Sequence, residues 1–171
     1  LSGGGIDGAF SARGGRRLTE ARLKLPCIGG VRCPTGDAKL TTAGDLACTH
    51  VIHAVGPDFN LRDVMFDMSL LYRAYQSALE CARLAKVKSL AVCVISGGIF
   101  RGPHTAKLMI AVGMRAIADN VYPGLEVVAF TMFSEEEKFW ASKLCIGMLR
   151  ERIALDSAST LRLQAELDAG P

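Results

Sequence analysis

The sequence lacks the features that mark several large classes of protein. It has no apolar run close to the ~20 residues that a membrane-spanning helix needs, so we expect no contact with a membrane. Its charge is nearly balanced, with 20 Lys and Arg against 17 Asp and Glu, and the basic residues form no patch, which argues against nucleic acid as a partner. The first residues have neither the basic flank nor the apolar stretch of a signal peptide.

Cysteine is present but is not arranged as in a disulfide scaffold or a zinc site. The six cysteines are scattered, and no two form a Cys-x-x-Cys pair. Scattered cysteines in apolar contexts are typical of a reducing compartment, so we expect an intracellular protein. A strand over Cys48–His53 would place Cys48 and His50 on one face and His53 on the other, so we predict a structural role there rather than a metal site.

The 171 residues, half of them hydrophobic, are enough for a single domain with a buried core. We expect a domain over residues 1–155 and a polar tail over 156–171. Helical and strand patterns alternate, which indicates an α/β fold with helices on both faces of the sheet. The near-continuous apolar runs suggest that the strands after Lys88 and Gly124 are buried on both faces. The expected helices span 9–17, 63–86, 106–120 and 135–155, and the expected strands 38–42, 50–55, 89–95 and 125–132.

Two glycine-rich loops are the strongest candidates for chemistry. The first is residues 3–8, Gly-Gly-Gly-Ile-Asp-Gly, and the second is residues 96–103, Ser-Gly-Gly-Ile-Phe-Arg-Gly-Pro. Glycine lets a backbone approach a ligand closely, and N–H groups at a helix start attract anions. Two such loops facing each other would clamp a diphosphate, whereas each alone also fits a plain turn. Neither loop is a Walker A or Rossmann motif.

Five segments together resemble the macro domain family, whose members bind ADP-ribose. Besides the two glycine loops, they are Cys33-Pro-Thr-Gly-Asp-Ala-Lys39, Thr49-His-Val-Ile-His-Ala-Val-Gly-Pro57 and the strand Val127-Val-Ala-Phe-Thr-Met-Phe-Ser134. The segments stand in the family's order and cover roughly residues 2–145.

The resemblance implies a three-layer α/β/α sandwich with a mixed central sheet. In the family two strands precede the first glycine loop, and this chain starts after that point. Two residues depart from the family's usual pattern. Ser11 stands where hydrolase members often have His, and Gly97 where Thr or Ala is commoner.

The resemblance also implies roles for individual residues. Asp7 would orient or deprotonate a water for attack at the anomeric carbon, although Asp is also a common helix N-cap. Phe100 would lie against the distal ribose and Phe133 against the adenine, although both rings also suit a core. Arg101 would meet a phosphate or stay solvated. The remaining ligand-binding residues would be Gly3, Gly4, Gly5, Ile6, Gly8, Ser96, Gly97, Gly98, Ile99 and Gly102.

The expected function is therefore recognition of ADP-ribose, free or attached to protein, with hydrolysis of mono-ADP-ribosyl groups. Two alternatives stay open: a non-catalytic reader module, and a phosphatase acting on ADP-ribose 1″-phosphate. The expected partner is ADP-ribose or a mono-ADP-ribosylated protein. The scheme requires no metal and no redox cofactor.

Overall fold

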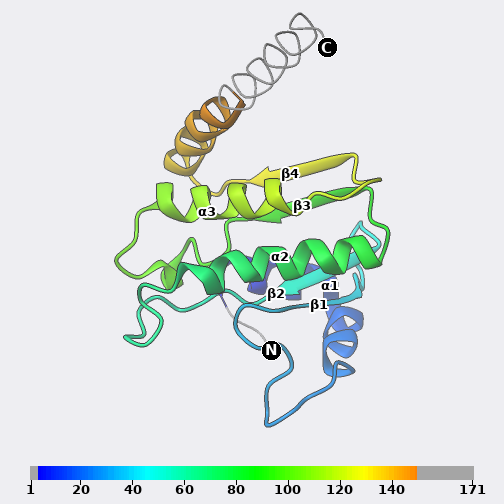
Figure 1. The fold of residues 1–171 in the computed structure, drawn as a ribbon. Coiled ribbons are helices and arrows are strands. Elements are labelled where there is room, and N and C mark those ends of the chain that lie inside the picture. The colour runs from blue at the N-terminus through cyan, green and yellow to red at the C-terminus, as the bar shows by residue number, and fades with distance from the viewer. Residues whose placement is uncertain (1–3, 150–171) are drawn as a thin grey trace, which may run out of the picture.

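The computed structural model describes residues 4–149 (Figure 1). Gly3, the expected end of the last helix at residue 155 and the tail 156–171 lie outside the described residues. A last helix covers 135–149, and its Ser134 Oγ accepts from Glu137 N as an N-cap, as predicted. The preceding elements are α1 (Gly5–Leu23), β1 (Ala38–Thr42), β2 (His50–Ala54), α2 (Met68–Leu84), β3 (Ser89–Cys93), the 3₁₀ turn η1 (Ile99–Arg101), α3 (Ala106–Asp119) and β4 (Val127–Thr131).

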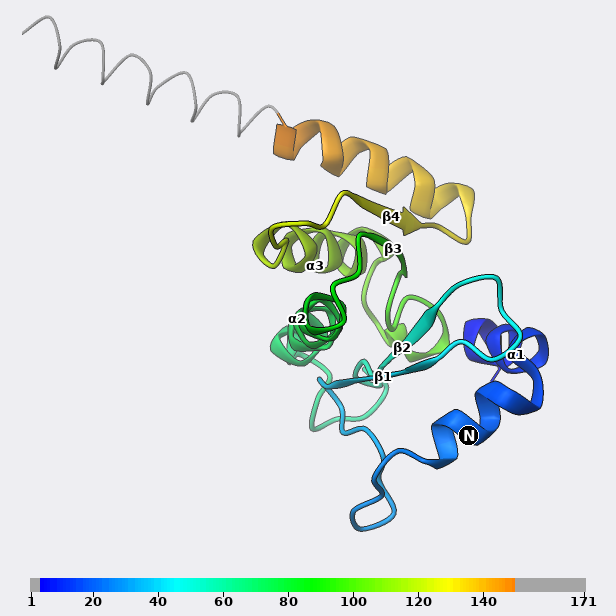
Figure 2. The same cartoon turned by 90° about the vertical axis from the view of Figure 1, so that its right-hand side faces the viewer.

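The strands form two ladders of opposite type. β1 pairs antiparallel with β2, and β3 pairs parallel with β4. Helices α2 and α3 lie on one side of the strands and α1 on the other (Figure 2). This layered arrangement, with antiparallel and parallel strands, confirms the expected α/β class. Among the described residues the two ladders are separate two-stranded sheets rather than one continuous sheet.

Two apolar clusters hold these layers together. The larger joins α2 and α3 to β3 and β4, and the smaller joins α1 to the β1–β2 ladder through Leu18, Ala43 and Val51. Tyr75 links the large cluster to the second glycine loop. Its ring is fully buried, and its hydroxyl donates to Cys93 O and accepts from Ile95 N, at 3.2 and 2.8 Å. The end of β3, where that loop begins, is thus fixed to α2.

The prediction that β3 and β4 are buried on both faces is wrong for the described residues. Exposure alternates along both strands, with Ser89, Ala91, Ala129 and Thr131 on the open face. The large side chains Leu90, Val92, Val128 and Phe130 pack into the core on the helix side. The physical reason is that α2 and α3 cover one face only.

Two helix boundaries also differ from the predicted ones. α2 begins at Met68 rather than at residue 63, because the Asp67 side chain accepts a hydrogen bond from Ser69 N and starts the helix there. α1 begins before residue 9 and continues past residue 17, with non-helical angles at Gly15 that divide it in two.

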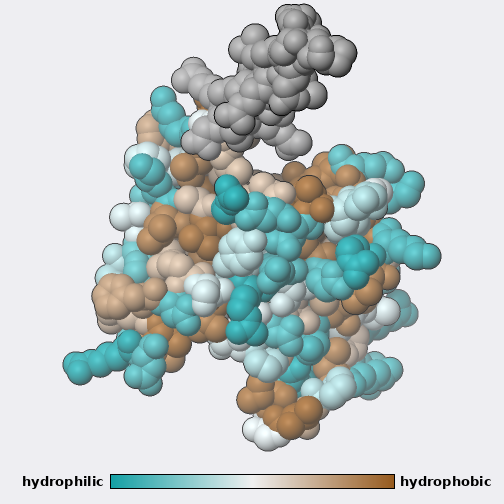
Figure 3. Space-filling view, viewed as in Figure 1, coloured by the Kyte–Doolittle hydropathy of each residue, from teal (hydrophilic) through white to brown (hydrophobic). Residues whose placement is uncertain are grey.

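The surface gives two further observations. The loop between α1 and β1 projects from the lower end in Figure 1 and is largely hydrophobic in Figure 3, with Ile28 81% exposed. Over residues 4–149, no helix is both long and apolar enough to cross a membrane.

Candidate functional site

Most of the first glycine loop is helical in the structure, because α1 begins at Gly5 within it. Gly4 stands at the N-cap position and makes no side-chain cap bond, and Gly5 has a φ of +58°, in the left-handed region that favours glycine. Asp7 lies in the first helical turn rather than at the cap, so the N-cap alternative for this residue is wrong. The first N–H groups of a helix have no intrahelical acceptor, which leaves those of Gly5 and Ile6 available to an anion.

The Asp7 carboxylate is held by an arginine from the far end of the same helix. Arg22 Nη2 donates to Asp7 Oδ1 at 2.9 Å, and Arg22 Nη1 donates to Ser11 Oγ at 2.7 Å. The Arg22 side chain is almost completely buried, whereas 47% of the Asp7 side chain remains exposed. The carboxylate is therefore fixed from the protein side and open on the solvent side.

His53 of β2 lies beside this ion pair. Thr41 Oγ1 donates its one proton to Thr42 O, so His53 Nε2 is the donor in its 2.8 Å bond to Thr41 Oγ1. Burial, together with the positive charge of Arg22, lowers the pKa of His53 from its usual 6.5 to about 4, although Asp7 acts in the opposite direction. His53 is thus a neutral imidazole at physiological pH.

The second glycine loop is anchored to the segment that follows β2. Ser96 has a φ of +54°, and its Oγ donates to Pro57 O at 2.7 Å. Phe100 O accepts from Phe59 N at 2.9 Å, and Ile99 O accepts from the Asn60 side chain at 2.8 Å. Within the described residues, the N–H groups of Ile99 and Phe100 donate to no acceptor, because they belong to the first turn of η1.

The apolar side chains predicted to bind ligand are exposed rather than part of a core. Phe100 is 51% exposed and Phe133 is 98% exposed, and Ile99 is also open to solvent. Arg101 is only partly exposed. Phe133 is fixed through its backbone, whose N–H donates to Glu137 Oε2 at 2.6 Å. Core packing therefore does not explain the presence of Phe100 or of Phe133.

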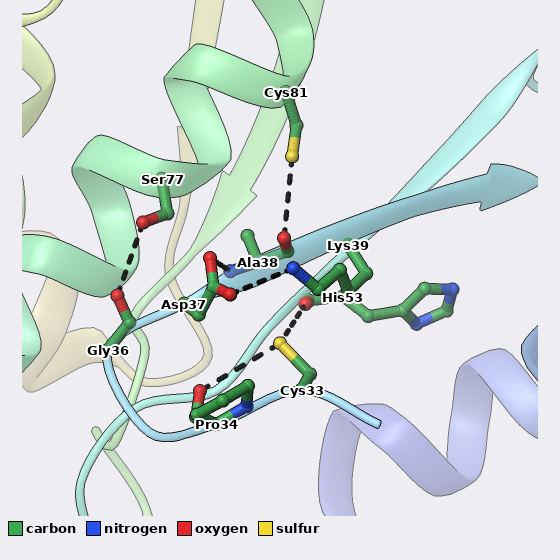
Figure 4. A network of polar contacts seen from close by, with 9 residues as sticks. All are labelled: Cys33, Pro34, Gly36, Asp37, Ala38, Lys39, His53, Ser77 and Cys81. Atoms are coloured by element: carbon green, nitrogen blue, oxygen red, sulfur yellow. Dashed lines mark hydrogen bonds and ion pairs between the residues drawn. The ribbon is translucent and has the colours of Figure 1, made fainter. Parts of the chain in front are cut away.

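The segment Cys33–Lys39 forms a set of structural hydrogen bonds to neighbouring elements rather than a reactive centre (Figure 4). The Cys33 thiol donates to His53 O, the Cys81 thiol to Ala38 O and Ser77 Oγ to Gly36 O. Burial raises the pKa of both thiols, which keeps them protonated and poorly nucleophilic. These bonds join the start of β1 to β2 and α2.

Two concave regions of the surface lie away from the glycine loops. A cavity of about 520 Å³ is lined by β1 and α2 residues, among them Lys39 and Cys81. A second, of about 490 Å³, is an apolar groove between α2 and α3. Neither is lined by a residue of the two loops. Within residues 4–149, no three His, Cys, Asp or Glu side chains are grouped as metal ligands.

Sequence reasoning missed two members of the site, Arg22 and His53 in its contact with Thr41. The adjacent pair Gly14–Gly15 was the available signal for Arg22, since it indicates a break that would turn the second half of the helix back. For His53 there was no local signal, because its proximity to Arg22 depends on how α1 packs on β1.

Three comparisons with known proteins agree. The family described as Macro domain matches residues 1–111. Macro domain-containing protein VPA0103 of Vibrio parahaemolyticus is 38% identical over 80% of this chain and 77% of its own length. The O-acetyl-ADP-ribose deacetylase of Enterobacter cloacae is 38% identical over 80% of this chain and 74% of its own. The solved macrodomain of Oceanobacillus iheyensis with ADP superposes with a TM-score of 0.75 at 26% identity, covering 88% of this chain and 80% of that one.

Proposed function

Since this chain belongs to the macro domain family, we propose that it binds ADP-ribose through its two glycine loops and hydrolyses mono-ADP-ribosyl groups from proteins. A similar macrodomain is solved with ADP, and a relative of 38% identity is named for an ADP-ribose derivative. Both ligands contain the adenosine diphosphate group.

In the proposed binding mode the backbone holds the diphosphate. The free N–H groups at the start of α1 and of η1 supply donors without any cationic side chain, as anion sites at helix starts do. The Gly3–Gly5 and Ser96–Gly102 amides form the two sides of the clamp. The exposed Phe133 ring stacks on adenine, and Phe100 lies against the distal ribose.

In the proposed reaction Asp7 orients a water molecule toward C1″ of the distal ribose. The water oxygen bonds to C1″, the bond from C1″ to the linking atom of the protein side chain breaks, and the proton given up by the water goes to the departing side chain or to solvent. ADP-ribose and the unmodified protein are the products. The negative charge of Asp7 also stabilises oxocarbenium-like charge at C1″.

One observation carries the catalytic part of the proposal: a half-exposed carboxylate in a glycine loop, fixed by a buried arginine. The exposed side of this carboxylate leaves room for a water molecule and a substrate, while the arginine fixes its other side. A second candidate reaction, deacetylation of O-acetyl-ADP-ribose, is favoured by the relative's name. It uses the same water near the same ribose.

The test is turnover of the Asp7→Ala variant on a mono-ADP-ribosylated protein and on O-acetyl-ADP-ribose. We expect turnover to fall by ~10²-fold or more, the scale of a positioned acid–base group. The affinity for ADP-ribose, measured by calorimetry, should change much less, because the backbone amides remain. Asp63→Ala, at an exposed carboxylate before α2, is the matched control and should retain full turnover.

The products separate the two reactions, since release of ADP-ribose marks the first and release of acetate the second. A folded wild-type protein that binds ADP-ribose but turns over neither substrate would replace the hydrolase with a reader module. Absence of ADP-ribose binding by the folded protein would overturn the whole proposal.

A further inference from the structure

The buried arginine beneath Asp7 has an arrangement that a simple surface ion pair does not have. Its two terminal nitrogens are used separately, Nη2 for the Asp7 carboxylate and Nη1 for the Ser11 hydroxyl. Both bonds are short, and only 5% of Arg22 is accessible. A planar guanidinium fixed at two points has little freedom left, so it also restricts the carboxylate that it contacts.

The kink in α1 at Gly15 makes the contact between Arg22 and Asp7 possible. In a straight helix residues 7 and 22 would lie ~22 Å apart, at 1.5 Å per residue, far beyond the reach of one side chain. Gly15, with φ +63° and ψ −162°, breaks the helix and turns the second half back toward the first (Figure 2). The turn is held by Asp45 N, which donates to Gly14 O.

The surroundings of Arg22 also indicate that it serves to hold Asp7. A buried charge is expensive unless it is paired, and the neighbouring His53, being neutral, adds no second positive charge. Asp7 is therefore the anionic partner that the contacts show, and it is also the acid open to solvent. Since Arg22 is buried, it acts on a ligand through the groups that it contacts, and Asp7 is the acid among the described contacts.

We propose that Arg22 is a positioning residue for the reaction: anchored by Ser11, it holds the Asp7 carboxylate in the orientation that directs the attacking water. This inference rests on the proposed hydrolase function, because it assigns a role within that reaction. Arg22 does not contact substrate and is not a catalytic residue.

A double-mutant cycle tests the proposal. We expect Arg22→Gln to lower kcat by ~10-fold or more, since a small misplacement of a catalytic group is costly. The KM and the ADP-ribose affinity should stay within ~3-fold, as the diphosphate contacts are backbone amides far less dependent on this pair. In the Asp7→Ala background Arg22→Gln should cause no further loss of kcat, because it acts through the missing carboxylate. Arg16→Gln, at an exposed arginine of the same helix, is the control and should leave kcat unchanged.

Two gentler variants keep the proposal testable if Arg22→Gln does not fold. Ser11→Ala removes one anchor of the guanidinium and should lower kcat several-fold with little change in KM. Arg22→Lys keeps the positive charge but cannot donate to Asp7 and Ser11 from two separate nitrogens, so its kcat should be only part of the wild-type kcat. The positioning role would be overturned if the wild type were active and neither Ser11→Ala nor Arg22→Lys changed its kcat. It would also be overturned if the loss of kcat from Arg22→Gln or Ser11→Ala added fully to the loss from Asp7→Ala. Both results would leave the hydrolase intact. An inactive wild type would overturn the hydrolase itself, and the positioning role with it.

Discussion

Neighbouring glycines in the second loop are glycine for different reasons. A Cβ at Gly102 would lie 2.5 Å from Phe59 O, and its φ is +59°. At Gly97 a Cβ would lie 2.7 Å from Val94 Cγ1. At Gly98 a Cβ would meet nothing within 4 Å, and φ is −93°. The fold itself therefore requires glycine at Gly102 and favours it at Gly97, whereas the open side of Gly98 is available to a ligand.

This difference makes Gly98→Glu a sharp test of the loop as a diphosphate cradle. The added carboxylate should repel a diphosphate at the start of η1 and lower the ADP-ribose affinity by ~10²-fold or more, equivalent to about 3 kcal/mol. The melting temperature should stay close to that of the wild type, because the side chain enters open space. Calorimetric titration and thermal unfolding of the same preparation provide both quantities.

Two variants at neighbouring positions control for this result. Gly98→Ala adds bulk without charge and should bind far better than Gly98→Glu. Gly102→Ala should instead unfold at a lower temperature, because it strains a left-handed residue against a backbone carbonyl. Full ADP-ribose affinity in a folded Gly98→Glu protein would show that the diphosphate lies elsewhere.

At the scale of the element, α1 is the helix that builds the site. Its first half carries Asp7 and Ser11, and its second half carries Leu18 for the core and Arg22 for the carboxylate. The two halves depend on Gly15, which adopts angles that other residues rarely reach and whose Cβ would lie 2.4 Å from Asp45 Oδ2. Stability and site geometry are thus coupled through one glycine.

Gly15→Ala should therefore reduce both properties together. We expect a loss of about 1–3 kcal/mol in the free energy of unfolding, the usual cost of a residue held in a strained region. The kcat should also fall, since the kink sets the distance between Asp7 and Arg22. Chemical denaturation and steady-state kinetics measure the two effects.

The matched substitution is Gly147→Ala, in the helix over 135–149. A Cβ there meets nothing within 4 Å, and alanine favours a helix over glycine, so this variant should be at least as stable as the wild type. Should Gly15→Ala keep both full stability and full kcat, the kink would not be the element that builds the site.

At the scale of the whole molecule, the pH dependence of stability reports the packing of α1 on the strands. The pKa of His53 is about 4 in the folded protein and near 6.5 in the unfolded chain. Between these values the unfolded chain takes up a proton that the folded protein excludes. The contribution of His53 is therefore complete above pH 6.5 and is lost as the pH falls toward 4.

We expect the wild type to lose about 1–2 kcal/mol of stability across this window, after allowing for solvent screening of a partly exposed ring. His53→Gln keeps a donor for Thr41 but does not titrate, so its unfolding free energy should be flatter between pH 6.5 and 4. The Asp37 carboxylate titrates at a lower pH, because the hydrogen bond from Lys39 keeps its pKa below its usual 3.8. Parallel curves for wild type and His53→Gln would show that His53 is not buried beside Arg22.

Local patterns determined a large part of this protein. The strand over 38–42, the helix of α3 and the Ser134 cap follow from alternation, helical spacing and capping chemistry, which involve only neighbours in sequence. The two glycine loops and the family were also evident from the sequence, because a backbone that approaches a ligand needs glycine whatever surrounds it. Asp67 marked the start of α2, and the prediction overlooked it.

Tertiary structure decided what depends on which faces meet. The apolar runs of β3 and β4 did not show that one face of each strand, including Val127, would be exposed, because the hydrophobicity of a strand does not reveal how many of its faces are covered by helices. The contact between Asp7 and Arg22 joins residues fifteen positions apart and exists only because Gly15 turns the helix back. The neutral state of His53 likewise follows from burial beside a positive charge. A local pattern such as Gly14–Gly15 can indicate a break in the helix, but which side chains then meet depends on packing geometry.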